Sequence, residues 1–295
     1  MDPLDEGPMR ALMYFAALIA GMLGVVAIAT WPAWELVNQL VPVPFHRVGN
    51  RLAMLGLAVG LVLVARQLGV NNRVAMGYGI SGGAFLRQLV LGFCFGMLLM
   101  LPLSALMLAL GLRVPVPGAN FSALINLALA SVLSGLTIAL IEETFMRGAM
   151  YSAIERESGV LPAVLATAML YAGAHFFARY KISTEDANFL SGFELVGGSL
   201  RSFSHPEIIF DAFICLASVG VLLALVRRHT GNIAACIGLH AGWVTVMLVT
   251  RRLTTAAPDH GGAWLLSQHD GFVGYLTLGW TAAVAVPLLA YYRKA

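Results

Sequence analysis

Residues 122–141 read SALINLALASVLSGLTIALI, a stretch of uncharged residues that runs directly into Glu142 and Glu143. A helix needs about 20 apolar residues to cross the hydrocarbon core of a bilayer, where lipid offers the backbone no hydrogen-bond partner. The stretch therefore predicts a membrane-spanning helix, and two adjacent carboxylates follow it directly.

The whole chain shares this character. Of its 295 residues, 59% are hydrophobic and 11% are charged, against roughly 25% charged in soluble domains. Apolar stretches continue from residue 11 to the C-terminus without a long polar interruption. We expect an all-α, polytopic membrane protein with about eight transmembrane helices and a polar intramembrane cavity, in a single integral membrane domain over residues 1–295. The expected spans are 11–34, 52–70, 89–112, 123–150, 161–178, 206–227, 232–250 and 271–292.

Two segments do not fit a simple series of spans. A single helix over 121–157 would be about 55 Å long, so it either overshoots the bilayer or breaks near Ser131, Ser134 and Gly135. Residues 179–205 form the longest linker and mix charged with apolar side chains, which predicts a short interfacial helix or a lid. The net charge of +3 comes from scattered arginines rather than a basic cluster, so we expect the lipid bilayer and not nucleic acid as a partner.

Several ionisable side chains lie inside or at the ends of the expected spans, where such groups are costly and commonly functional. Glu143 and Arg147 are four residues apart and can pair along one helix face, whereas Glu142 lies about 100° away and lacks that partner. On a separate span, His175 follows Tyr171 by one helical turn. On a third span, His240 lies between small residues that permit close helix packing.

Each of these groups alone also has a structural explanation, as a buried ion pair or an interhelical hydrogen bond. Two carboxylates and two histidines on three spans instead predict an acid/base site, provided that the helices converge. The other histidines lie in linkers or at helix ends and are expected at the surface; they are His46, His205, His229, His260 and His269. Asp211, near Pro206, is expected to cap a helix or to lie at the membrane interface.

Other classes of site are less well supported. No HExxH motif is present, Asp211 has no second aspartate within a span, and the serines near Gly82 and Gly135 lack a nucleophile-elbow pattern. No cofactor is expected, although Glu142, Glu143, His175 and His240 are possible zinc ligands. A proton-coupled transporter and a non-catalytic membrane adaptor or immunity protein remain alternatives to an enzyme.

The polar residues resemble the motifs of the CPBP family of intramembrane endopeptidases, which includes the CAAX prenyl proteases and proteins of the bacteriocin-processing and abortive-infection type. The family carries EExxxR, FxxxH and HxxxN or HxxxD, each on its own transmembrane helix. Here these positions are Glu142-Glu143-xxx-Arg147, Tyr171-xxx-His175 and His240-xxx-Val244. The resemblance covers a protease-like core of about 121–250 and departs from the pattern at Tyr171 and, more seriously, at Val244.

The resemblance implies a glutamate-type peptidase that cleaves near the terminus of a hydrophobic or membrane-anchored protein. Glu142 and His175 would activate a water molecule, Glu143 and Arg147 would support them, and His240 would stabilise the oxyanion. It also implies a multi-pass protein of a bacterial-type inner (cell) membrane. The residues themselves favour Glu142 as the base, because it lacks an i+4 partner, but they do not distinguish the roles of the two histidines.

Overall fold

The computed structural model describes residues 10–118, 121–177 and 180–293, and these are nearly all helical. The α-helices are α1 (Arg10–Asn38), α2 (Phe45–Val64), α3 (Gly82–Ala109), α4 (Phe121–Glu143), α5 (Tyr151–Ser158), α6 (Val160–Phe177), α7 (Ser191–Arg201), α8 (Pro206–Thr230), α9 (Ala234–Leu253) and α10 (Tyr275–Tyr292). A π-helix, η1 (Thr144–Met150), joins α4 to α5, and η2 (Ser202–Ser204) and η3 (Ala263–Leu265) are short 3₁₀ helices. The strands β1 (Arg113–Pro115) and β2 (Thr254–Ala256) pair antiparallel.

Eight helical stretches among the described residues are long and apolar enough to cross a membrane, which confirms the expected fold class. The second and third begin seven residues earlier than predicted, at Phe45 and Gly82. The first turn of α2 contains the polar residues His46 and Arg47. The first turn of α3 follows an N-cap, Ser81, whose side chain accepts a hydrogen bond from the backbone N–H of Ala84. Apolar runs alone miss such helix starts.

Of the two alternatives for residues 121–157, the structure shows the long unbroken helix and no break near Ser131, Ser134 and Gly135. Ser122–Ser158 is one continuous helical stretch of 37 residues, about 55 Å long, and it leaves α geometry only at η1. The small residue Gly135 instead allows close packing on α9, because a Cβ there would lie 2.7 Å from the carbonyl oxygen of Ala241.

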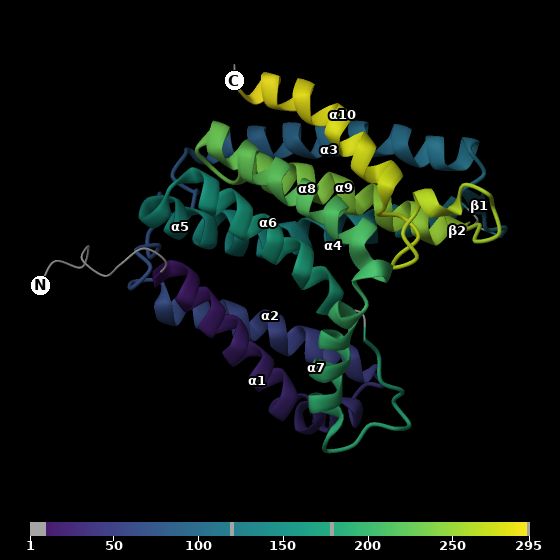
Figure 1. Cartoon of the computed structure of the whole chain (residues 1–295), viewed down its shortest axis with the longest axis horizontal. Coiled ribbons are helices and arrows are strands. Elements are labelled where there is room, and N and C mark those ends of the chain that lie inside the picture. The colour runs from purple at the N-terminus through teal and green to yellow at the C-terminus, as the bar shows by residue number, and fades with distance from the viewer. Residues whose placement is uncertain (1–9, 119–120, 178–179, 294–295) are drawn as a thin grey trace, which may run out of the picture.

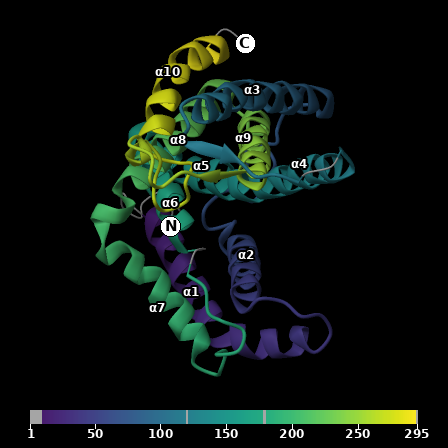
Figure 2. The same cartoon turned by 90° about the vertical axis from the view of Figure 1, so that its right-hand side faces the viewer.

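Helix α9 is the centre of the molecule, packed against α3, α4 and α8. It is 72% buried over its span, more than any other described span. Glycines on both sides make the α3–α9 contact: Gly92 and Gly96 on α3 face Gly238 and Gly242 on α9. A Cβ at Gly238 would lie 2.1 Å from a backbone oxygen of α3, so this approach requires glycine. Figures 1 and 2 show α3, α8, α9 and α10 grouped together.

Helices α1, α2 and α7 form a second group, set off from the first in both views (Figures 1 and 2). The linker after α6 does contain a short helix, as predicted, although its residues 178–179 lie outside the described part. This helix, α7, packs on α1, where a Cβ at Gly192 would meet the carbonyl oxygen of Ala27 at 2.1 Å. It does not line the cavity described below.

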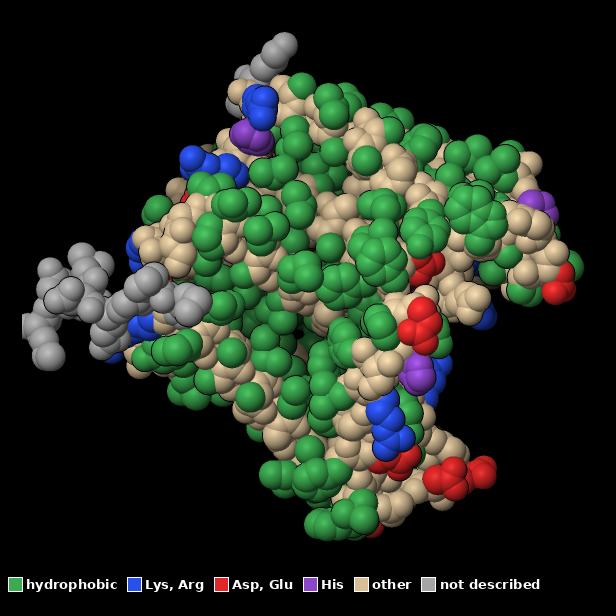
Figure 3. Space-filling model, viewed as in Figure 1, with side chains coloured by type: hydrophobic (Ala, Val, Ile, Leu, Met, Phe, Trp, Pro, Cys, Tyr) green, Lys and Arg blue, Asp and Glu red, His purple; other side chains and the backbone are tan. Residues whose placement is uncertain are grey.

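Hydrophobic side chains cover most of the face in Figure 3, and charged ones lie toward its edges. Val62, near the end of α2, is 75% exposed, and Leu133, within α4, is 69% exposed. Such a surface is unfavourable in water and suits lipid. The chain is therefore an integral, multi-pass membrane protein.

Candidate active site

Glu143 is the centre of a buried polar network that joins α4, η1 and α9. Its Oε1 accepts a hydrogen bond from Arg147 Nη1 at 3.0 Å, and neither side chain is exposed to any extent. The same oxygen accepts from His240 Nδ1 at 2.8 Å. Arg147 Nη2 also donates to the backbone oxygen of Gly220 on α8 at 3.0 Å. The predicted Glu143–Arg147 pair is thus present, and it also fixes His240.

Glu142 has a different environment from its neighbour, as its helical offset predicts. Its side chain is 34% exposed, and its Oε2 lies 3.9 Å from His240 Nε2. This gap is too long for a direct hydrogen bond, but one water molecule could contact both atoms. His240 therefore has a carboxylate on each side, with Glu143 at Nδ1 and Glu142 near Nε2.

His175 is held by its own helix. Its Nδ1 lies 2.8 Å from the backbone oxygen of Tyr171, one turn earlier. Because a carbonyl oxygen can only accept, Nδ1 carries the proton and the lone pair of the neutral ring is on Nε2.

The Tyr171 ring connects the groups of all three motifs. Its centroid lies 4.6 Å from that of His175 and 5.8 Å from that of His240. The Arg147 guanidinium carbon lies 4.9 Å from the same ring, in the range of a cation–π contact. The tyrosine, which departs from the family pattern, thus keeps the packing role of an aromatic ring.

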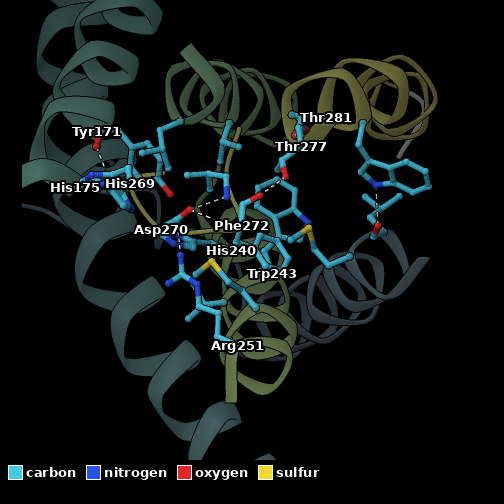
Figure 4. Close-up of a pocket in the computed structure, with 18 of the residues that line it drawn as sticks. Tyr171, His175, His240, Trp243, Arg251, His269, Asp270, Phe272, Thr277 and Thr281 are labelled. Atoms are coloured by element: carbon cyan, nitrogen blue, oxygen red, sulfur yellow. Dashed lines mark hydrogen bonds and ion pairs between the residues drawn. The ribbon is translucent and has the colours of Figure 1, made fainter. Parts of the chain in front are cut away.

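His175 and His240 line one cavity of about 150 Å³ between α3, α6, α8, α9 and α10, whereas Glu142 is not among its lining residues. The cavity is more apolar than predicted: Leu99, Leu216, Trp243, Met247 and Phe272 contribute to its wall. Figure 4 shows Tyr171, His175 and His269 together at one end.

Sequence reasoning missed several cavity residues. Arg251 lines the cavity and pairs with Asp270. It lies on the same face of α9 as His240, Val244 and Met247, at helical spacings of four, three and four residues. That spacing is the signal that could have indicated Arg251.

The segment 254–274, which carries Asp270 and His269, also contributes to the wall, and no sequence pattern indicated it. Arg113 anchors the segment by donating from Nε to Thr254 Oγ1 at 2.7 Å and from Nη1 to the backbone oxygen of Gly271.

The structure revises two expectations about polar residues in this region. His269 is half-buried and not a fully solvated histidine: its ring centroid lies 4.2 Å from that of Phe176, and it lines the cavity. Asp211 lies inside α8 and is not its N-cap residue, so the capping expectation is wrong, whereas a position at the membrane interface stays a prediction. Its Oδ1 accepts from Ser267 Oγ at 2.9 Å and so ties the 254–274 segment to α8. These contacts were missed because a linker that folds back over a bundle cannot be placed from hydropathy.

Val244 lines the cavity one turn beyond His240 and is 8% exposed, so a polar side chain there would face the same space. Within residues 10–118, 121–177 and 180–293, no group of three or more His, Cys, Asp or Glu side chains is arranged to hold a metal ion.

Eight apolar spans among the described residues, a buried Glu–Arg–His network and a cavity lined by three histidines define a polytopic membrane protein with an intramembrane polar site. Residues 124–246 match the family model described as type II CAAX prenyl endopeptidase Rce1-like. The match includes all three motifs and confirms the resemblance to the CPBP family. No curated protein and no solved structure matches the chain.

Proposed function

We propose that the chain is an intramembrane endopeptidase that hydrolyses a peptide bond near the terminus of a hydrophobic or membrane-anchored protein. The observation that carries the proposal is the environment of His240, with Glu143 on Nδ1 at 2.8 Å and Glu142 near Nε2 at 3.9 Å. The family match over 124–246 supports the same reaction class. The lipid-facing surface and the largely apolar cavity suit a hydrophobic peptide.

In the proposed reaction, Glu142 accepts a proton from a water molecule whose position His175 Nε2 helps to fix. The resulting hydroxide attacks the carbonyl carbon of the peptide bond. Glu142 then gives the proton to the leaving nitrogen as the C–N bond breaks, and the products are a carboxylic acid and an amine. Glu142 suits this role because it is the acid that Arg147 does not bind and that water can reach.

His240 is proposed to stabilise the oxyanion from Nε2. To donate from both nitrogens the ring must be protonated, and the carboxylates of Glu142 and Glu143 on its two sides favour that arrangement. Glu143 and Arg147 hold the ring in place. The two histidines thus differ in their hydrogen bonds: His175 presents a lone pair, and His240 presents a donor.

The decisive experiment compares purified wild type with Glu142→Gln in liposomes, using membrane-anchored peptides and mass spectrometry of the products. Glutamine keeps the shape of the side chain but cannot accept the proton, so cleavage should be lost while folded protein remains. Glu185→Gln, at an exposed acid in the linker before α7, is the matched control. Cleavage by the Glu142 variant at the wild-type rate would reject Glu142 as the base.

The same samples test the alternatives. A proton-coupled transporter predicts solute or proton flux in these liposomes, and a non-catalytic adaptor predicts that biological function survives Glu142→Gln. No step of the proposed reaction uses a metal, so dialysis against a zinc chelator should leave the rate unchanged. We propose a bacterial-type inner membrane as the location, which membrane fractionation would test.

A further inference from the structure

The π-helix η1 follows Glu142 and Glu143 directly and changes the hydrogen bonding of the helix. The backbone N–H of Tyr151 donates to the oxygen of Met146, five residues earlier. In an α-helix it would donate to Arg147, four residues earlier. The carbonyl oxygen of Arg147 therefore loses its α-helical donor in a fully buried position, where an unpaired carbonyl is costly.

A side chain of α8 supplies the replacement. Arg227 is 8% exposed, and its Nε donates to the backbone oxygen of Arg147 at 3.2 Å. Its Nη2 donates to Ser152 Oγ at 3.2 Å, and its guanidinium carbon lies 6.0 Å from the centroid of the Tyr151 ring. One guanidinium thus bonds to a residue inside η1 and to a residue of α5 just after it, and charged donors make the stronger hydrogen bonds.

η1 and α8 each donate a side-chain hydrogen bond to the backbone of the other. Arg147 donates to the backbone of Gly220 on α8, and Arg227 of α8 donates to the backbone of Arg147. Because α8 fixes Arg147 in this way, a change of η1 from π to α hydrogen bonding has to move the residues that precede Arg147, which include Glu142 and Glu143.

The segment 65–81 also contacts η1. Tyr78 Oη lies 2.5 Å from Thr144 Oγ1, which itself donates to the oxygen of Leu140, so the tyrosine is the donor. Burial raises the pKa of Tyr78, which keeps that proton in place. A Cβ on Gly148 would lie 2.9 Å from the Met76 carbonyl oxygen. The π turn is therefore packed against this segment as well as against α8.

We propose that Arg227 is a positioning residue that keeps η1 in its π form and so aims Glu142 and Glu143 at His240. If η1 reverted to α geometry, the preceding helix would turn by about one residue, or roughly 100°, relative to Arg147. The carboxylates would then leave their places on either side of His240. The consequence for catalysis rests on the proposed peptidase function, whereas the consequence for η1 does not.

The neighbouring arginine provides a matched control. The Arg228 side chain is 55% exposed, and within the part of the chain that the structure describes it forms a 3.5 Å ion pair with Glu155. Arg227→Met, Arg227→Lys and Arg228→Met would be purified and compared in two measurements: amide hydrogen exchange of peptides covering residues 144–152, and kcat and KM for a membrane-anchored peptide.

Arg227→Met should speed exchange across 144–152 and lower kcat by about tenfold to a hundredfold with KM nearly unchanged, because misplacing reactive groups by about 1 Å can cost a factor of this size. Arg227→Lys keeps a charged donor and should recover part of both properties. Arg228→Met should match the wild type in both.

Wild-type exchange in Arg227→Met would overturn the proposal, and so would faster exchange with an unchanged kcat, since Arg227 would then be structural only. If Arg227→Met is not recovered folded, Arg227→Lys decides by the same two criteria. A wild type that cleaves no peptide would reject the proposed function, while the exchange comparison would still decide whether Arg227 holds the π turn.

Discussion

Arg147→Ala tests the buried network most directly. It removes the donor to Glu143 at 3.0 Å, the donor to Gly220, and the cation over the Tyr171 ring. Glu143 would remain completely buried, with the hydrogen bond from His240 Nδ1 still in place. Breaking a buried ion pair by removing one partner costs about 3–5 kcal/mol. We therefore expect the free energy of unfolding to fall by about that amount, and the yield of folded protein to fall with it.

The assay is unfolding in mild detergent, followed by size-exclusion chromatography and thermal denaturation of each variant. Arg228→Ala is the control, because its partly exposed pair with Glu155 should contribute about 0–1 kcal/mol. The double variant Glu143→Gln, Arg147→Met removes both charges of the Glu143–Arg147 pair and should be more stable than Arg147→Ala. Wild-type stability of Arg147→Ala, or a double variant no more stable than it, would refute the reasoning.

Three further outcomes are expected. Glu142→Gln should abolish cleavage with the thermal midpoint nearly unchanged, measured on the same preparation; retained cleavage contradicts it. Val244→Asn should raise kcat with KM nearly unchanged if the new amide donates to the oxyanion, a contribution of about 2.7–4 kcal/mol in other hydrolases. The effects of Val244→Asn and Tyr171→Phe on kcat should add strictly in the double variant, unless Tyr171 compensates for the missing Asn at position 244. Gly238→Ala should destabilise the fold by about 1–3 kcal/mol through overpacking, whereas Gly173→Ala, with open space at its Cβ, should not; equal melting temperatures would contradict this.

Much of the fold could be predicted because its main determinant is local. Eight apolar runs give eight spans, and a spacing of four residues gives the Glu143–Arg147 pair. The helix starts at Phe45 and Gly82 were missed because their first turns are not apolar. The π-helix after Glu143 was missed because it depends on contacts from α8 and from residues 65–81, which no local pattern encodes.

The site was predictable to the extent that its residues lie on spans. Glu142, Glu143 and His240 could be selected because ionisable groups are rare there, and His240 does lie beside both carboxylates. The roles of these residues stay predictions that the proposed experiments test. Asp270 and His269 could not be found, because they reach the cavity through a linker that folds back over the helices and is held there by Arg113 and Asp211.

The glycine contact between α3 and α9 has a consequence for biosynthesis. Residues 82–109 leave the ribosome long before residues 234–253, yet each helix supplies the surface on which the other packs. Until α9 arrives, the glycine face of α3 has only lipid to contact, and Glu143 lacks His240. The nascent chain therefore carries a half-completed charge network from the synthesis of Arg147 until that of His240. A chain truncated before residue 234 should be recognised by membrane quality control as incomplete, even though six of the eight spans are already present.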